Sequence, residues 1–136
     1  MLRIIKLIRP LAKYLMIVWL LTILIVSSIP YIPTLKIHTA KADFRLDYLM
    51  HFCEYGLLAF LTFLSFAGDE FRIGFRKALI IIPCLMLIAF LDELHQKLIP
   101  GRTYNVNDIL SNMTGIVAAS LFTYIVFRII LNGIKK

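Results

Sequence analysis

Four long apolar stretches restrict the folding of this chain more than any other feature. The first, from Tyr14 to Leu35, and the last, from Ile109 to Phe127, contain no charged residue. Both are close to the about 20 residues that a helix needs to cross the hydrocarbon core of a bilayer. Two shorter charge-free runs, 55–68 and 78–91, can span it only with neighbouring charged turns. The sequence therefore predicts one all-α domain over residues 1–136, a bundle of four transmembrane helices over about residues 11–32, 47–68, 76–98 and 108–128.

The composition also favours a membrane environment. Apolar residues make up 60% of the chain, above the about 45–50% that is typical of soluble domains. The 15 Lys and Arg residues outnumber the 8 Asp and Glu residues, and in a soluble protein this excess would suggest a nucleic-acid partner. Here the basic residues lie mainly between the apolar stretches, where they determine membrane topology. We therefore expect no nucleic-acid partner.

The basic residues predict the orientation of the helices. If both termini are cytoplasmic, ten basic residues fall on the cytoplasmic side and five on the outer side. Because cytoplasmic connections of membrane proteins are enriched in Lys and Arg, this count favours cytoplasmic termini. The first apolar stretch is longer than the core of a signal peptide, so we expect an uncleaved anchor. The chain is thus expected to be a multi-pass membrane protein.

This orientation gathers the acidic residues near one side of the membrane. Six of the eight fall on the outer side, and all but one of the six lie in or at predicted helices. The polar residues of three helices would then share one depth near the outer leaflet. The six outer acids are Asp43, Asp47, Glu54, Asp92, Glu93 and Asp108.

Three ionisable residues form a stripe on the second predicted helix. Asp47, His51 and Glu54 stand at i, i+4 and i+7, which places them within about 60° of arc on one face. Each such group costs about 2.5 to 3.5 kcal/mol at the centre of a membrane helix, and less near its end. The stripe therefore predicts a polar partner or a hydrated cavity, in which His51 would act as acid or base and Asp47 would orient it.

Further polar groups stand where the third predicted helix ends and the fourth begins. Asp92, Glu93 and Gln96 close the third helix. Asp108 opens the fourth helix, and Asn112 follows one turn later. A primary amide at this depth needs hydrogen-bond partners, because its burial without them is costly. We therefore expect these groups to meet the stripe of the second helix.

A turn connects these two helices. The Pro100-Gly101 dipeptide is typical of a turn, and Arg102 follows it. Because the free N–H groups at a helix start favour anions, we expect Arg102 and the start of the fourth helix to hold a phosphate or carboxylate. Further along, Gly115 and Ala119 have the four-residue spacing of small residues that lets membrane helices approach closely.

Taken in order, four of these motifs resemble the VanZ-like family of small bacterial membrane proteins. The motifs are Asp47-x-x-x-His51-Phe52-x-x-Tyr55, Asp92-Glu93-x-x-Gln96, Pro100-Gly101-Arg102 and Asp108-x-x-x-Asn112-x-x-Gly115. The resemblance covers about residues 47–119. Tyr48 departs from it where the family often has Lys, and Ala119 where a second Gly is common. The first departure changes the charge near the predicted site.

The resemblance implies a multi-pass protein of the plasma membrane of a bacterium. The family takes its name from a member associated with low-level resistance to the glycopeptide teicoplanin, so the resemblance also implies an envelope function. It assigns no reaction, because function does not follow from fold. Whether the chain is an enzyme, and which cofactor it would use, therefore stays open.

From the residues and the resemblance together we expect an outward-facing site for the head group of a membrane lipid or lipid-linked envelope precursor. Its side chains are divided by role. The candidate catalytic residues are Asp47, His51, Glu54 and Glu93, and the candidate ligand-binding residues are Tyr55, Asp92, Gln96, Arg102, Asp108 and Asn112.

Several alternatives remain. The polar residues would serve only helix packing in a structural or partner-binding subunit, or a pathway in a proton-coupled transporter. Glu93 and Lys97 have the spacing of a helical ion pair, and Asn107 or Asp108 would cap the fourth helix. A metal site is not expected, because His51 is the one histidine that the pattern places firmly among carboxylates.

Overall fold

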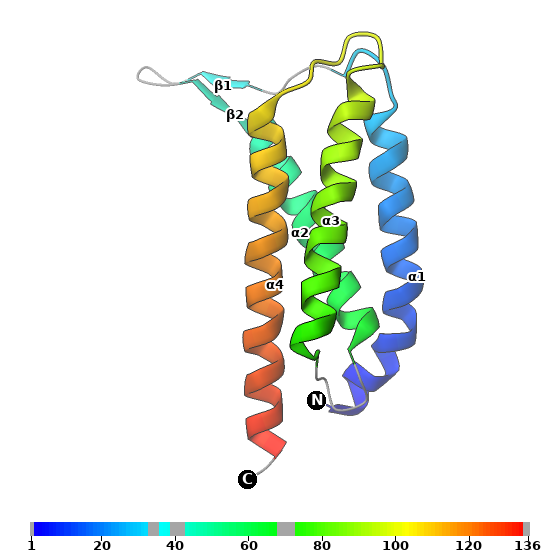
Figure 1. Ribbon diagram of the computed structural model, residues 1–136, viewed down its shortest axis with the longest axis vertical. Coiled ribbons are helices and arrows are strands. Elements are labelled where there is room, and N and C mark those ends of the chain that lie inside the picture. Colours follow the sequence, from blue (N-terminus) through cyan, green and yellow to red (C-terminus); the bar gives the residue numbers. More distant parts are fainter. Residues whose placement is uncertain (1, 33–35, 39–42, 68–72, 135–136) are drawn as a thin grey trace.

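The computed structural model describes residues 2–32, 36–38, 43–67 and 73–134. It contains four long helices and a short antiparallel hairpin (Figure 1). All four helices are long and apolar enough to cross a membrane, which confirms the predicted all-α bundle of four transmembrane helices. The helices are α1 (Leu2–Ser27), α2 (Leu46–Phe66), α3 (Phe75–Gln96) and α4 (Val106–Ile134), and the strands are β1 (Lys36–His38) and β2 (Asp43–Arg45).

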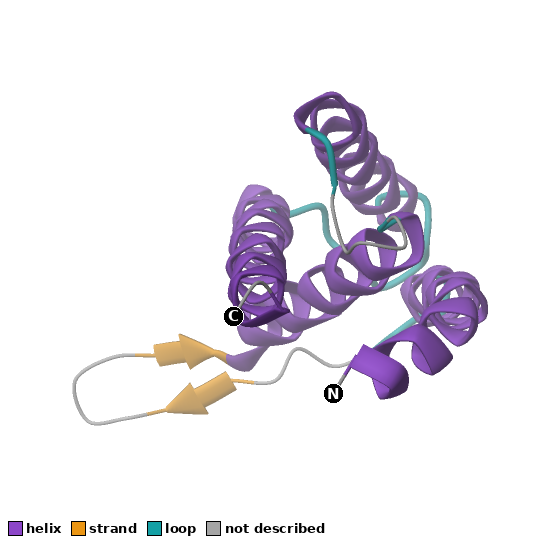
Figure 2. Ribbon diagram, turned by 90° about the horizontal axis from the view of Figure 1, so that it is seen from below, coloured by secondary structure: helices purple, strands orange, loops and turns teal. Residues whose placement is uncertain are grey.

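The helices alternate in direction along the chain. The start of α1 and the end of α4 lie at one end of the bundle, and the hairpin and the α3–α4 connection lie at the other (Figure 1). Viewed along the bundle, α2 lies among the other three helices (Figure 2). The starts of α2 and α4 and the end of α3 therefore meet at the hairpin end. The acidic residues of all three helices are located there.

The crossing of α2 and α4 is the tightest contact between helices. A side-chain carbon added at Gly115 would collide with the backbone carbonyl of Phe52, and one added at Gly56 would lie 3.4 Å from the carbonyl oxygen of Gly115. At position 115 only glycine allows the two backbones to come this close, whereas an added carbon at position 56 would make ordinary van der Waals contact. The predicted close approach at Gly115 is therefore present, whereas its partner Gly56 was not foreseen. The crossing holds the preceding turns of both helices side by side.

Apolar side chains fill the middle of the bundle and cover its outside. Tyr55, Leu58 and Ile116 are fully buried between the helices. Large apolar side chains such as Leu21 and Leu121 face outward. In water this outer surface would be unfavourable, but in a bilayer it meets lipid tails of the same polarity.

The helix boundaries differ from the predicted ranges mainly at α1 and α4. Helix α1 begins at Leu2 and ends at Ser27, where the hydroxyl groups of Ser27 and Ser28 donate to the carbonyl of Leu24. Pro30 disfavours helical geometry in the residue before it, so the helix ends earlier than its apolar composition suggested. Helix α4 starts two residues early, at Val106, and extends to Ile134. The hairpin was not expected.

Candidate functional site

A cavity of about 120 Å³ opens at the hairpin end of the bundle. We call it the polar cavity. Residues of all four helices contribute to its wall, together with Arg45 and the connection between α3 and α4. Seven of the ten predicted site residues line it, whereas Tyr55, Glu93 and Asn112 are fully buried. The seven are Asp47, His51, Glu54, Asp92, Gln96, Arg102 and Asp108.

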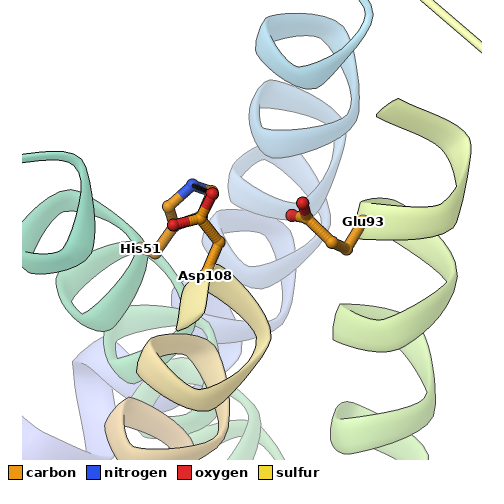
Figure 3. A group of neighbouring side chains, drawn as sticks. All are labelled: His51, Glu93 and Asp108. Carbon is orange, nitrogen blue, oxygen red and sulfur yellow. Dashed lines mark ion pairs between the residues drawn. The ribbon is translucent and has the colours of Figure 1, made fainter. Parts of the chain in front are cut away.

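His51 stands between two carboxylates in the wall of the cavity. Its Nε2 lies 3.8 Å from Oδ2 of Asp108, which is on α4. Its Nδ1 lies 4.0 Å from Oε2 of Glu54, one turn further along α2. The His51–Asp108 contact joins α2 to α4 just before their glycine crossing (Figure 3). The sequence placed both residues at the same depth, but the structure identifies Asp108 as the cross-helix partner of His51.

Asn105 connects α3 to the start of α4. Its backbone N–H donates to Oε1 of Glu93 at 2.9 Å, and its side-chain Nδ2 donates to Oδ1 of Asp108 at 3.0 Å. Its Oδ1 accepts from the N–H of Asn107 at 3.1 Å, which is the geometry of an N-cap. The cap of α4 is therefore Asn105 and not the expected Asn107 or Asp108. Glu93 is likewise bonded to Asn105 and buried, whereas Lys97 is exposed.

Tyr55 lies outside the cavity lining and donates a hydrogen bond to Asp92 of α3. Its hydroxyl donates to Oδ2 of Asp92 at 3.0 Å, and both side chains are buried. Predicted as a ligand-binding residue, Tyr55 thus lies outside the cavity lining and orients Asp92, which lines it. Gln96 lies one turn further along α3 and also lines the cavity.

Asp47 is paired with Arg45. The guanidinium of Arg45 donates to Oδ2 of Asp47 at 3.1 Å and stacks 5.0 Å from the ring centre of Tyr48. Burial lowers the pKa of Arg45, but the hydrogen bond that it donates to Asp47 and the nearby negative charge outweigh this effect and raise the pKa above its usual value. Arg45 therefore stays charged. Asp47, which was expected to orient His51, is engaged by this guanidinium.

Arg102 fastens the end of α1 to the connection between α3 and α4. Its Nη2 donates to the carbonyl of Val26 at 2.8 Å, and its Nε donates to the carbonyl of Ile29 at 3.3 Å. The Val26 carbonyl belongs to the last turn of α1, where a positive charge is favourable, and Ile29 follows the helix by two residues. Arg102 also lines the cavity, so it combines a packing role with a place in the wall.

The turn before Arg102 packs against the connection that follows α1. Gly101 adopts a φ of 77°, a conformation that L side chains rarely adopt. A side chain at this position would collide with Tyr31, whose N–H donates to the carbonyl of Pro100 at 3.1 Å. The glycine of the Pro100-Gly101-Arg102 motif therefore lets the loop reach Tyr31, and this contact sets the position of Arg102.

Several buried polar atoms of the site have no hydrogen-bond partner in the described part of the protein. They include Nδ1 of His51, Oδ1 of Asp92 and Oε2 of Glu93. Both side-chain amide atoms of Asn112 are also without a partner, although this residue is 0% exposed. Such atoms cost about 1 to 3 kcal/mol each when left unsatisfied. They are rare in native interiors, so each of them calls for a partner such as a water molecule, an ion or a ligand.

Negative charge prevails in the wall of the cavity. Four carboxylic acids line it, Asp47, Glu54, Asp92 and Asp108, against two arginines. The carboxylate of Glu93 is buried next to Asp108 and His51. Because Arg45 is bonded to Asp47 and Arg102 to backbone carbonyls, these cations only partly offset the acids.

Sequence reasoning missed three residues that position the site. Asn105 precedes the apolar run of α4, and this position is a signal for an N-cap. Arg45 was counted only as a determinant of topology, because its pairing with Asp47 depends on the hairpin. Trp19 donates from its Nε1 to the backbone carbonyl of Glu54 at 2.9 Å and so ties α1 to the site. Nothing in the sequence pattern indicates that contact.

Fold and site define a multi-pass membrane protein whose helices enclose an acid-rich cavity at one end of the bundle. The family model of VanZ/LLP1 matches residues 11–128 of the chain. The protein belongs to this family, and the resemblance found in the sequence is confirmed. None of the curated proteins and none of the solved structures matches the chain.

Proposed function

We propose that the polar cavity binds the head group of a membrane lipid or of a lipid-linked envelope precursor. The main support is that the wall of one cavity, at the end of a membrane-spanning bundle, contains both charged and apolar residues. Ile23, Val26 and Met50 provide the apolar part. A ligand with a polar head and an acyl or prenyl tail matches this combination, because each portion meets a surface of its own polarity.

The charges of the wall favour a head group that combines phosphate with hydroxyl or amino groups. Each guanidinium has five N–H donors, so Arg45 and Arg102 can bind phosphate oxygens in addition to Asp47 and the carbonyls near the end of α1. The carboxylates of Glu54 and Asp92, together with His51, accept hydrogen bonds from hydroxyl or ammonium groups. We place this cavity at the outer face of a bacterial plasma membrane, with both termini in the cytoplasm, because the basic residues favour that orientation.

The contacts in the other half of the bundle favour binding over proton-coupled transport. The hydroxyl groups of Thr62, Ser120 and Thr123 each donate to the backbone carbonyl four residues earlier in their own helix. Hydroxyl groups bonded in this way satisfy themselves locally and do not need a chain of water or of other polar groups. The hydrogen bonds of Arg102 to the backbone near the end of α1 support a purely structural role. Such a role does not explain why Nδ1 of His51 and Oδ1 of Asp92 are buried without a hydrogen-bond partner in the described part of the protein.

Native mass spectrometry of the protein in mild detergent tests the proposal. We expect wild type to carry a phospholipid or a prenyl-phosphate lipid, and both His51→Ala and Glu54→Gln to carry less of it. The matched control is His95→Ala, because the side chain of His95 is exposed and bonds to Ser28 at the surface. Folding of each variant is checked by its thermal transition. Equal lipid content in folded wild type and in both site variants would contradict the proposal.

A lipid-linked cell-wall precursor is one ligand of this class, and its sequestration would alter the susceptibility of a cell to teicoplanin. We propose this as the cellular consequence. It is supported by membership of the VanZ/LLP1 family. A deletion strain complemented with wild type should then differ in teicoplanin susceptibility from one complemented with His51→Ala at equal protein level.

A further inference from the structure

Three side chains with metal-binding atoms converge beside the polar cavity from three helices. His51 comes from α2, Glu93 from α3 and Asp108 from α4 (Figure 3). One ligand atom of each lies within 4.8 Å of those of the other two. We call this group the three-helix cluster. Residues that are 15 to 57 positions apart in the sequence thus present one imidazole and two carboxylates to a common point.

Glu93 provides a second, independent observation. Its side chain is 0% exposed, and its Oε2 has no hydrogen-bond partner in the described part of the protein. The carboxylate of Glu93 points toward His51 and Asp108 (Figure 3). Removing an ionised carboxylate from water costs several kcal/mol unless a cation or hydrogen bonds replace the lost hydration. The backbone N–H of Asn105 donates to Oε1 of Glu93, so Oε2 is available to a further partner.

The surrounding charges favour a cation as that partner. Among the described residues, neither Glu93 nor Asp108 has a lysine or arginine within ion-pair distance. The nearby guanidinium groups are hydrogen-bonded to other partners, Arg45 to Asp47 and Arg102 to the end of α1, and the charge of Arg45 reaches Asp108 only from beyond ion-pair distance. Two carboxylates that share a buried space repel each other unless a proton or a metal ion separates them. A divalent cation would balance both at once.

We propose that His51, Glu93 and Asp108 bind a divalent transition-metal cation of the Zn²⁺ or Mn²⁺ type. Imidazole selects transition metals over Mg²⁺ and Ca²⁺, and carboxylates complete a mixed nitrogen and oxygen set. Tetrahedral ligands at about 2.1 Å from zinc lie about 3.4 Å from one another. Small side-chain rotations bring the cluster from its present spacing to this distance.

The position of the cluster gives the metal access to the polar cavity. His51 and Asp108 both line the cavity, and Glu93 is buried. Three protein ligands leave one coordination position open, as in catalytic zinc sites. That position takes an oxygen atom of water or of a ligand in the cavity. The inference goes beyond head-group binding and does not depend on it, because metal binding requires only the three ligands.

The first test measures the metal alone. The full-length protein is purified in detergent without a polyhistidine tag, depleted with a chelator and titrated separately with Zn²⁺ and Mn²⁺. Bound metal is counted by mass spectrometry of the eluted complex. We expect one equivalent per chain and a thermal transition that rises with metal concentration, because the ion binds the folded state preferentially. If depleted wild type took up neither ion, the carboxylates would be neutralised by protons and the proposal would be overturned.

The second test locates the ion. Glu93→Gln and Asp108→Asn keep the size of each side chain and remove one anionic ligand, so each should weaken binding by at least about tenfold. His95→Gln is the matched control, because it removes an imidazole that is exposed and bonds to Ser28 away from the cluster. Unchanged affinity in both cluster variants would overturn the assignment.

X-ray absorption spectroscopy on metal-loaded wild type identifies the ligand atoms of the bound ion, even if a variant does not fold. The proposal predicts one imidazole and two carboxylate ligands and no sulfur. Sulfur from Cys53 or Cys84 in the first shell, or a second imidazole, would overturn it. Lipid content is read separately by native mass spectrometry, so failure of the metal site and failure of head-group binding are distinguishable.

Discussion

Asn105 is the residue that fixes the positions of two buried carboxylates at once. Its backbone reaches Glu93 on α3, and its side chain reaches Asp108 on α4. The same side chain caps α4 by accepting from Asn107. One small residue thereby sets the start of a membrane helix and the spacing of the three-helix cluster.

Asn105→Ala should lower the free energy of unfolding by about 1 to 2 kcal/mol, because it removes an N-cap and a bond to a buried carboxylate. The free energy of unfolding is measured by adding a denaturing detergent stepwise to the protein in a mild detergent. Asn107→Ala is the control, since Asn107 is exposed and its side chain makes, within the described residues, a long 3.4 Å contact with the Tyr48 hydroxyl. Equal losses in the two variants would show that Asn105 has no special role.

Sequence reasoning predicted which polar residues gather at one end of the bundle better than it predicted which of them contact each other. Helical periodicity placed Asp47, His51 and Glu54 on one face, and all three line the cavity. It did not predict that Asp47 pairs with Arg45, because that bond depends on how the hairpin enters α2. It did not expect a metal site, because it found one firmly placed histidine, and it could not foresee that Glu93 and Asp108 of two other helices come close to His51.

The crossing of α2 and α4 determines which side chains can meet at the site. Gly56 and Gly115 let the two backbones come into contact. Both helices start at the hairpin end (Figure 1), so residues one to two turns before the crossing lie at equal depth. This shared direction is what brings His51 next to Asp108.

Gly115→Ala should therefore destabilise the bundle, by about 1 to 3 kcal/mol, because the added carbon collides with the backbone of Phe52. The direction of the change is informative, because replacing glycine by alanine at a helix position without a steric clash would instead stabilise the helix by about 1 kcal/mol. Gly74→Ala is the control for the added carbon, because that carbon meets nothing within 4 Å, and its cost is limited to the weaker N-cap that alanine gives α3. The free energies of unfolding of Gly115→Ala and Gly74→Ala are measured in the same way as for Asn105→Ala. If Gly115→Ala lost no more stability than Gly74→Ala, the close crossing of α2 and α4 would be contradicted.

The helices themselves could be predicted, whereas their ends and the hairpin could not. Apolar length sets where a chain crosses a bilayer, and that signal is strong in all four segments. The end of α1 depends on local bonds of Ser27 and Ser28 to Leu24. The hairpin pairs Lys36 with Arg45 in strands of three residues, which are too short to leave a periodic pattern in the sequence.

For the whole molecule, the orientation of the bundle decides which compartment the polar cavity faces. Thr103 is exposed at the hairpin end, and Phe75 is exposed at the start of α3 at the other end. In cells expressing a chain in which Cys53 and Cys84 are replaced by serine, a membrane-impermeant maleimide should label Thr103→Cys and spare Phe75→Cys. Lysed cells provide the control, in which both should react. Labelling of Phe75→Cys alone in intact cells would place the cavity on the cytoplasmic side.

The central claim is that polar residues from separate helices form one site at the hairpin end, and a double-mutant cycle between His51 and Asp108 tests it most directly. The free energies of unfolding of His51→Gln, Asp108→Asn and the double variant are compared with wild type, with His95→Gln and Asp108→Asn as the control pair. We predict a coupling of about 0.5 to 1.7 kcal/mol for His51 with Asp108 and none for the control pair. Strictly additive effects of His51 and Asp108 would mean that α2 and α4 do not share a site.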